Sequence, residues 1–183
     1  MYEIEVKAKL KNREEVKGKL ESFGCKFSEE LHQVDHIFIP EDQVFPPPFS
    51  VPVLRVRKQN DKWIFTMKIS QTSRQDCIEK EFEILEGDKM IEVLHYIGYK
   101  QASIVDKKRI KTMYKDMEVV LDVVEGLGEF IEVEKQVDDG NHESRLKTQE
   151  ELYNFLEELG VTKEDYVIGG KYDIMLFEKY GMK

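Results

Sequence analysis

The chain lacks the features that mark several classes of protein. Its 183 residues include two cysteines, Cys25 and Cys77, without the spacing of a zinc site or of a disulfide framework. We therefore expect two free thiols in a reducing cytoplasm. No uncharged apolar run approaches the roughly 18 residues that a membrane-spanning helix needs. The N-terminal segment carries charge within its apolar alternation, which is not typical of a signal peptide. These absences predict a cytoplasmic protein with no membrane partner.

Excess basic charge is also missing. The chain has 28 Lys and Arg residues against 37 Asp and Glu residues, which gives a net charge of −9. Binding to the phosphate backbone of a nucleic acid requires a basic face, so nucleic acid is not an expected partner. The hydrophobic share of 40% is nevertheless large enough for a folded core.

Histidine is scarce, with four residues in the chain: His32, His36, His95 and His142. The spacing of His32 and His36 would let both bind a metal from one helix. The surrounding segment, 31–39, alternates like an extended strand, so we interpret these two histidines as residues of a strand surface.

Proline is confined to one segment. All five prolines lie between residues 40 and 52, and they predict one irregular loop, Pro40–Pro52, within a single domain that spans residues 1–183. The sequence leaves open whether this loop covers the mouth of a binding site or forms a dimer contact, and whether the protein is a monomer or a homodimer.

Helices and strands follow from capping residues and from periodicity. Segments with capping residues near Asn12, Gly87 and Thr148 end in Gly24, Gly98 and Gly160, and a fourth helix is expected over 172–180. Period-two alternation predicts eight strands, over 2–10, 34–39, 53–58, 62–70, 78–85, 102–114, 118–124 and 129–137. The dipeptides 60–61 and 115–116 suit hairpin turns. The pattern predicts an α+β protein with a closed or strongly curved antiparallel sheet.

One face of the predicted strands is rich in charge. Glu3, Glu5, Lys7 and Lys9 alternate with apolar residues, and other strands repeat this sorting. For any one strand, a solvated sheet face explains the pattern. The whole set, however, has few neutral polar residues and holds as many acids as bases. The seven acids are Glu3, Glu5, Glu81, Glu83, Asp122, Glu132 and Glu134, and the seven bases are Lys7, Lys9, Arg55, Arg57, Lys68, Lys107 and Arg109.

These residue types suit phosphate chemistry if the face lines a common lumen. Carboxylates without His or Cys favour Mg²⁺ or Mn²⁺ over Zn²⁺. Arginine and lysine bind phosphate oxygens. Together they predict metal-assisted phosphoryl chemistry.

The order of these residues resembles the CYTH superfamily of class IV adenylate cyclases, thiamine triphosphatases and inorganic triphosphatases. Glu3-Ile4-Glu5-Val6-Lys7 matches its N-terminal Glu-x-Glu-x-Lys signature. The partners follow in the family's order, and the ending 170–176 resembles the Ser-Tyr-x-x-Leu-Leu motif, with Lys171 in place of Ser. The partners are Asp35, Arg55, Arg57, Lys68, Glu81, Glu83, Lys107, Arg109, Asp122, Glu132 and Glu134.

The resemblance implies a triphosphate tunnel, which is an eight-stranded closed antiparallel barrel with surrounding helices. It implies that Glu3, Glu5, Asp122, Glu132 and Glu134 bind Mg²⁺ or Mn²⁺, while Glu81 and Glu83 bind a second metal or orient the basic residues. It implies that Lys7, Lys9, Arg55, Arg57, Lys68, Lys107, Arg109 and Lys171 bind ATP or another triphosphate-bearing small molecule. Among these, Glu5, Lys7, Lys107 and Arg109 are the expected catalytic residues.

The expected activity is that of a class IV-like adenylate cyclase, a lyase that converts ATP to cyclic AMP and pyrophosphate. The alternative is a hydrolase that acts on thiamine triphosphate, a nucleoside triphosphate or tripolyphosphate. A non-catalytic binder of nucleotides or polyphosphate is a third interpretation. No residue type in the sequence distinguishes the first two reactions, because both use the same positioning and charge neutralisation.

Overall fold

The computed structural model describes residues 2–73, 76–137 and 142–181, and the side chains of residues 2, 3, 71–73, 76, 77 and 142 are not included in this description. The chain divides into two compact units. Unit 1 comprises residues 1–30, 108–124 and 128–168, and unit 2 comprises residues 31–107, 125–127 and 169–183. That the chain forms one domain stays a prediction.

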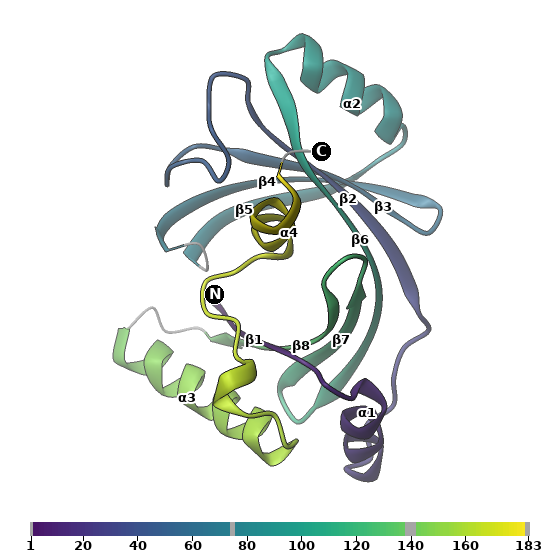
Figure 1. Ribbon diagram of the computed structural model, residues 1–183, viewed down its shortest axis with the longest axis vertical. Helices are drawn as coiled ribbons and strands as arrows, with labels where there is room; N and C mark the ends of the chain where they lie inside the picture. The colour runs from purple at the N-terminus through teal and green to yellow at the C-terminus, as the bar shows by residue number, and fades with distance from the viewer. Residues whose placement is uncertain (1, 74–75, 138–141, 182–183) are drawn as a thin grey trace. The chain divides into compact units, whose positions relative to one another are not determined.

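Eight strands form one sheet in the order β1–β8–β7–β6–β2–β3–β4–β5 (Figure 1). Their bounds are β1 Tyr2–Lys9, β2 Leu31–Pro40, β3 Val53–Gln59, β4 Lys62–Ser73, β5 Asp76–Ile84, β6 Tyr99–Tyr114, β7 Met117–Val124 and β8 Gly128–Val137. The antiparallel pairing and the predicted hairpin turns at 60–61 and 115–116 are confirmed.

The predicted closure of the sheet into a barrel is wrong. The strand order has two ends, β1 and β5, and no strand pair joins them in the described parts of the chain. Part of the outer edge of β1 is occupied instead by the segment that follows the third helix. The backbone N–H of Val167 donates to the carbonyl of Lys7 at 2.9 Å, and Tyr166 forms an isolated bridge with Ala8. Backbone groups used in this way cannot pair with another strand.

Four α-helices accompany the sheet in the described residues: α1 Arg13–Ser22, α2 Gly87–Tyr96, α3 His142–Glu158 and α4 Tyr172–Tyr180, with a short 3₁₀ turn at Lys163–Asp165. Asn12 caps α1, because its side-chain oxygen accepts from the N–H of Glu15 at 3.2 Å. The predicted cap at Thr148 is wrong. The Thr148 hydroxyl donates to the carbonyl of Ser144 inside α3 at 3.1 Å, so it does not cap a helix end.

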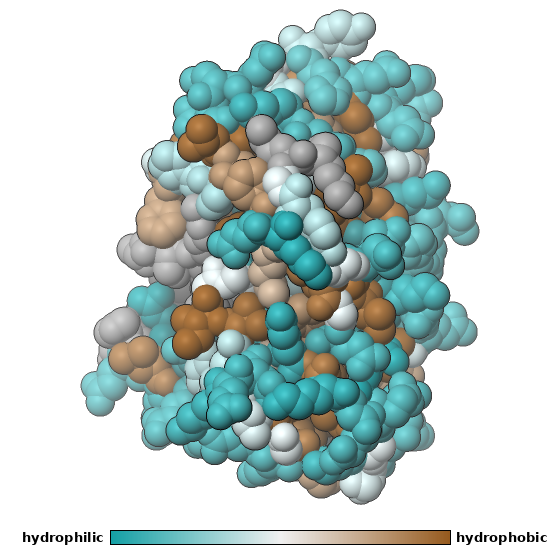
Figure 2. Space-filling model, viewed as in Figure 1, coloured by the Kyte–Doolittle hydropathy of each residue, from teal (hydrophilic) through white to brown (hydrophobic). Residues whose placement is uncertain are grey.

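The core of unit 1 explains why its strands sort charged from apolar residues. Alternate residues of β1, β7 and β8, such as Val6, Leu121 and Val133, are at most 1% exposed, and they pack against Leu20 of α1 and Leu156 of α3. In Figure 2, hydrophilic side chains cover the visible faces of these two helices. The other face of these strands therefore holds the charged residues.

Unit 2 has apolar clusters on both faces of its strands. On one face, Phe38, Leu54 and Val56 pack with Leu94 of α2. A second apolar cluster lies on the other face. It consists of Ile37, Ile39 and Ala102 of the sheet, Ile174 of α4 and Phe45 of the proline-rich loop, with Phe177 packed against them. The loop therefore packs on α4 within unit 2.

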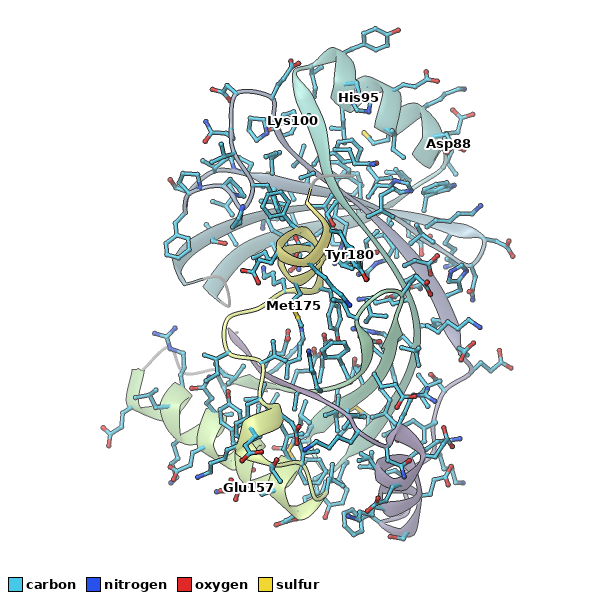
Figure 3. The ribbon with its side chains drawn as sticks, in the orientation of Figure 1. Asp88, His95, Lys100, Glu157, Met175 and Tyr180 are labelled. Carbon is cyan, nitrogen blue, oxygen red and sulfur yellow. The ribbon has the colours of Figure 1, made fainter. Side chains whose placement is uncertain are left out.

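The histidines have local structural contacts. His32 and His36 lie on β2, as predicted; the His32 ring bonds to Asp106 at 2.8 Å, and the His36 ring bonds to Gln101 at 3.0 Å. His95 lies on α2 (Figure 3), with its ring edge-on to that of Phe38 at 5.5 Å.

Two further expectations concern the cysteines and membrane-spanning helices. Cys25 is a buried free thiol, whereas the side chains of Cys77 and His142 lie outside the described set. Over the described helices, none combines the length and the apolar character needed to cross a membrane.

Candidate functional site

Unit 1 places three glutamates in a row across three neighbouring strands. Glu5 of β1 lies directly opposite Glu134 of β8, and Glu134 lies directly opposite Glu118 of β7. Directly opposed side chains share one face of a sheet, and like charges in such positions are destabilising. The row therefore needs nearby cations.

Lys7 supplies one of these cations. It lies opposite Glu132 in the register, and its ammonium is 3.0 Å from a Glu132 carboxylate oxygen and 3.4 Å from Glu5. Burial by itself would lower the pKa of Lys7, but the charges and hydrogen bonds of Glu132 and Glu5 raise it above its usual value. Lys7 is therefore a charged, buried lysine between two carboxylates.

Arg109 and Lys111 of β6 supply the others. The Arg109 guanidinium donates to both oxygens of Asp122, at 2.7 and 2.5 Å, and to Glu132 at 2.7 Å. The Asp122 side chain is fully buried. Lys111 donates to Glu118 at 2.6 Å. We call the whole group the acidic cluster; its members are Glu5, Lys7, Arg109, Lys111, Glu118, Asp122, Glu132 and Glu134.

The acidic cluster suits a hard divalent cation by donor type. Its five carboxylates outnumber its three cations, and two of its directly opposed pairs carry like charge. Among the described side chains, however, no three of His, Cys, Asp or Glu meet closely enough to hold a metal ion. The carboxylates contact lysine and arginine instead. The side chain of Glu3 lies outside the described set, so its place in this cluster stays a prediction.

Sequence reasoning missed Glu118. Glu118 lies four residues before Asp122, and because side chains alternate with a period of two, both residues lie on the same face of β7. What makes Glu118 part of the row is its register opposite Glu134, and this register depends on how β7 pairs with β8.

Unit 2 contains a buried group of opposite character. The Arg57 guanidinium donates to both oxygens of Asp35, at 2.5 and 2.8 Å, and the ammonium of Lys107 is 4.0 Å from the nearer Asp35 oxygen. All three side chains are at most 10% exposed. Burial alone would raise the pKa of Asp35, but the hydrogen bonds from Arg57 and the charges of Lys107, Arg57 and Arg55 lower it well below its usual range.

Arg55 and Lys68 extend this group along β3 and β4. Arg55 donates to the Thr66 hydroxyl at 3.0 Å and to Glu81 at 2.8 Å. Lys68 is 2.6 Å from Glu79. Burial, followed by the charge of Arg55, lowers the pKa of Lys68 despite the presence of Glu79, and the charge of Lys171 lowers it further.

These residues form a cluster with more cations than carboxylates. We call it the basic cluster; its members are Asp35, Arg55, Arg57, Lys68, Glu79, Glu81, Lys107 and Lys171. Among the described side chains of this cluster, five cations face three carboxylates, and the members Asp35, Arg57 and Lys107 are buried. Such a setting favours the binding of anions.

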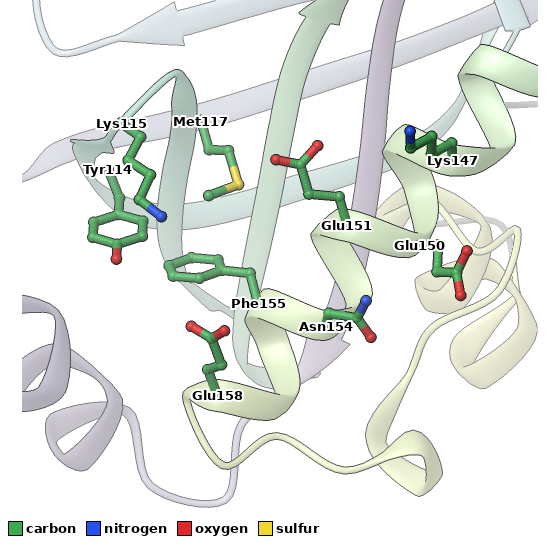
Figure 4. A pocket seen from close by; sticks show the side chains of 9 residues that line it. All are labelled: Tyr114, Lys115, Met117, Lys147, Glu150, Glu151, Asn154, Phe155 and Glu158. Atoms are coloured by element: carbon green, nitrogen blue, oxygen red, sulfur yellow. The ribbon is translucent and has the colours of Figure 1, made fainter.

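The remaining predicted residues lie elsewhere. Lys9 is exposed, and Glu83 forms an exposed ion pair with Lys62 at 2.8 Å. A hollow of unit 1 between α3 and the turn that joins β6 to β7 is drawn in Figure 4. Its lining consists of Tyr114, Lys115, Met117, Lys147, Glu150, Glu151, Asn154, Phe155 and Glu158, so among the described residues it contains no predicted site residue.

Comparison with known proteins identifies similar chains. The sequence profile of the CYTH domain matches residues 1–170. The curated protein "Putative adenylate cyclase MJ0240" from Methanocaldococcus jannaschii is 29% identical over 171 residues, which cover 91% of this chain and 94% of that protein.

Solved structures share the fold. The PH1819 protein from Pyrococcus horikoshii has a TM-score of 0.80 at 28% identity and covers 97% of this chain and 99% of its own. A protein from Hippeastrum, described as a "putative adenylyl cyclase" with "a dominant triphophatase activity", has a TM-score of 0.63 at 18% identity; the match covers 99% of this chain and 97% of that one. The latter similarity concerns the fold alone.

Proposed function

The chain belongs to the CYTH family, and from this premise we propose that it is a divalent-metal-dependent enzyme that acts on triphosphate-bearing small molecules. The first candidate reaction is the conversion of ATP to cyclic AMP and pyrophosphate. The observation that carries the proposal is the basic cluster, in which five cations face three carboxylates around the buried Asp35, Arg57 and Lys107. A buried excess of positive charge is stabilised by a polyanion.

In this proposal, Arg57 and Lys107 bind phosphate oxygens, and Asp35 holds both in place until the substrate arrives. The hydrogen bonds from Nε and Nη2 of Arg57 to Asp35 support this role, because they fix the planar fork that phosphate recognition requires. The full set of proposed triphosphate-binding residues is Lys7, Lys9, Arg55, Arg57, Lys68, Lys107, Arg109 and Lys171.

The proposed metal ligands are carboxylates of unit 1. Glu5 and Glu134, directly opposed on β1 and β8, form the centre of the set, and Glu3, Asp122 and Glu132 complete it. Bound Mg²⁺ or Mn²⁺ would supply charge neutralisation to the phosphate oxygens. In the free protein, Lys7 contacts Glu5 and Glu132, and Arg109 contacts Asp122 and Glu132. Glu81 has two possible roles in this proposal. The first is to orient Arg55, and their 2.8 Å contact supports it. The second is to bind a second metal together with Glu83.

The proposed mechanism depends on positioning and charge. In the cyclase reaction, the ribose 3′-oxygen forms a bond to the α-phosphorus and its proton passes to solvent, the bond from the α-phosphorus to the bridging oxygen breaks, and pyrophosphate leaves. Lys7, Lys107 and Arg109 would stabilise the negative charge that develops on the phosphoryl oxygens, and Glu5 would complete the proposed catalytic set. In the alternative reaction, water forms a bond to the terminal phosphorus and loses a proton to solvent, the bond from that phosphorus to the bridging oxygen breaks, and the diphosphate leaves while orthophosphate is formed.

The cyclase reaction is supported by the name of the Methanocaldococcus relative. The triphosphatase alternative is supported by the same proposed binding residues, because both reactions use the same positioning and charge neutralisation. Product analysis by ³¹P NMR separates the two. The protein is incubated with ATP, thiamine triphosphate or tripolyphosphate and with Mg²⁺ or Mn²⁺. Pyrophosphate with cyclic AMP identifies a cyclase, and orthophosphate identifies a triphosphatase. Binding of these compounds without turnover would instead identify the non-catalytic binder.

Two variants test the assigned residues. Glu134→Gln keeps the shape of the side chain and removes its charge, so we expect it to abolish metal-dependent turnover and leave the fold intact. Glu14→Gln is the matched control, because Glu14 is an exposed residue of the same type outside both clusters and outside the proposed site. Full activity of Glu134→Gln would contradict the metal assignment. Arg57→Ala should raise the KM for the triphosphate, and an unchanged KM would contradict its role.

A further inference from the structure

The first residue of α4 contacts the basic cluster through an aromatic ring. The ammonium of Lys107 lies 5.2 Å from the centroid of the Tyr172 ring. Both residues are buried, with 5% of each exposed. An ammonium within about 6 Å of a ring centroid, over its face, is attracted by the negative charge density of the ring. The contact is therefore of the cation–π type.

The contact matters because of what surrounds Lys107. Both oxygens of Asp35 already accept hydrogen bonds from Arg57, at 2.5 and 2.8 Å. The 4.0 Å between Lys107 and Asp35 is too long for a hydrogen bond. A buried ammonium is costly unless it is stabilised. The Tyr172 ring contributes to this stabilisation without adding a negative charge beside the ammonium.

The ring is held in place by the rest of α4. Ile174 packs with Ile37 and Ile39 of β2, and the Phe177 ring is edge-on to that of Phe45 at 5.1 Å. Met175 and Tyr180 lie on the same helix in Figure 3. The helix therefore packs on the strand that carries Asp35. The position of Tyr172 beside Lys107 follows from this packing.

We propose that Tyr172 is a positioning residue, whose ring keeps the Lys107 ammonium charged and aimed for a phosphate oxygen of the substrate. This inference rests on the proposed function, because it assumes that Lys107 binds triphosphate. It adds a role for Tyr172, which acts on the substrate through Lys107.

The first test compares two substitutions in the full-length protein. Tyr172→Leu removes the ring, and we expect the KM for tripolyphosphate or ATP to rise about tenfold, with a smaller change in kcat. Tyr172→Phe keeps the ring face and should restore the KM to within about twofold of the wild type. If Tyr172→Phe is as impaired as Tyr172→Leu, the hydroxyl matters instead of the ring, and the proposal fails.

A graded series separates the cation–π contact from packing. Phenylalanine with one, two or three fluorine atoms is placed at position 172, which weakens the ring's negative charge density and nearly preserves its shape. The logarithm of the KM should rise steadily with the number of fluorine atoms. The matched control is the same series at position 177, where the ring packs on Phe45, and the KM there should stay constant. A flat series at position 172 overturns the proposal.

A readout that needs no substrate distinguishes failure of this inference from failure of the proposed function. In protein labelled with ¹⁵Nζ-lysine, the Lys107 signal is assigned by its loss in Lys107→Arg, and its pKa is followed through the series at position 172. Asp35, whose carboxylate lies 4.0 Å from the Lys107 ammonium, and Arg57, which donates to Asp35, are retained throughout the series. A pKa that falls with fluorination supports the contact even if no triphosphate is turned over, whereas an unchanged pKa rejects it.

Discussion

Replacement of Asp35 by asparagine would test the balance of charge in the basic cluster. Asp35 is 4% exposed, and both of its oxygens accept hydrogen bonds from Arg57. Asparagine keeps the size of the side chain, but it removes the negative charge that offsets Arg57 and Lys107. Removing one partner of a buried ion pair costs about 3–5 kcal/mol. Because these groups are at most 10% exposed, water screens them little. We therefore expect Asp35→Asn to lower the free energy of unfolding by about that amount.

The assay is urea unfolding followed by circular dichroism, with and without tripolyphosphate. The anion should stabilise Asp35→Asn more than the wild type, because it replaces the missing negative charge. The control is Glu83→Gln, which breaks the exposed Lys62–Glu83 pair and should leave the urea midpoint unchanged. A loss below about 1 kcal/mol in Asp35→Asn would refute the reasoning. So would equal stabilisation of both proteins by the anion.

The pH dependence of the wild type has a defined sign. The pKa of Asp35 is lower in the folded protein than in the unfolded chain. Its contribution to stability is therefore complete above the unfolded pKa, which is about 3.9 for aspartate, and it is lost as the pH falls through the folded value. Between pH 5 and 8, Asp35 should leave the stability of the wild type constant.

Two further predictions concern other parts of unit 2. The pKa of Lys68 is lowered by burial and by Arg55 and Lys171, so at alkaline pH the binding of tripolyphosphate should take up protons. Calorimetry in buffers of different ionisation enthalpy measures this uptake. Lys68→Arg should abolish it, and equal uptake in this variant would contradict the assignment. A Cβ at Gly87 would lie 2.0 Å from the ring of Trp63, the single tryptophan of the chain, so Gly87→Ala should shift the tryptophan fluorescence and lower the free energy of unfolding by about 1–3 kcal/mol. Gly18→Ala, where the added Cβ meets no atom within 4 Å, should do neither. Unchanged fluorescence of Gly87→Ala would contradict the packing.

The alternation of residues along a strand predicted much of the candidate site. In β1, Glu5 and Lys7 fall on the face opposite Val6, and the structure buries Val6 in the core of unit 1. The faces were predictable because the period of two is local. The pairing of Glu5 with Glu134 was not, because it depends on a register between strands far apart in the sequence.

The errors have similar physical origins. A closed barrel was predicted, but the segment at Tyr166 and Val167 occupies part of the edge of β1, and two residues are too few to show an alternation. The pattern at Thr148 resembles a helix cap. Its hydroxyl bonds instead within a helix that already began at His142.

The most direct test of the central claim is the turnover of triphosphate compounds by the wild-type protein, with Mg²⁺ or Mn²⁺ and then with a chelator in excess. ATP, thiamine triphosphate and tripolyphosphate are each incubated with the protein, and the phosphorus-containing products are quantified. We predict that at least one is converted in the presence of metal, and that the chelator stops the conversion. No conversion of any of them with either metal, or conversion that persists in the chelator, would contradict the account.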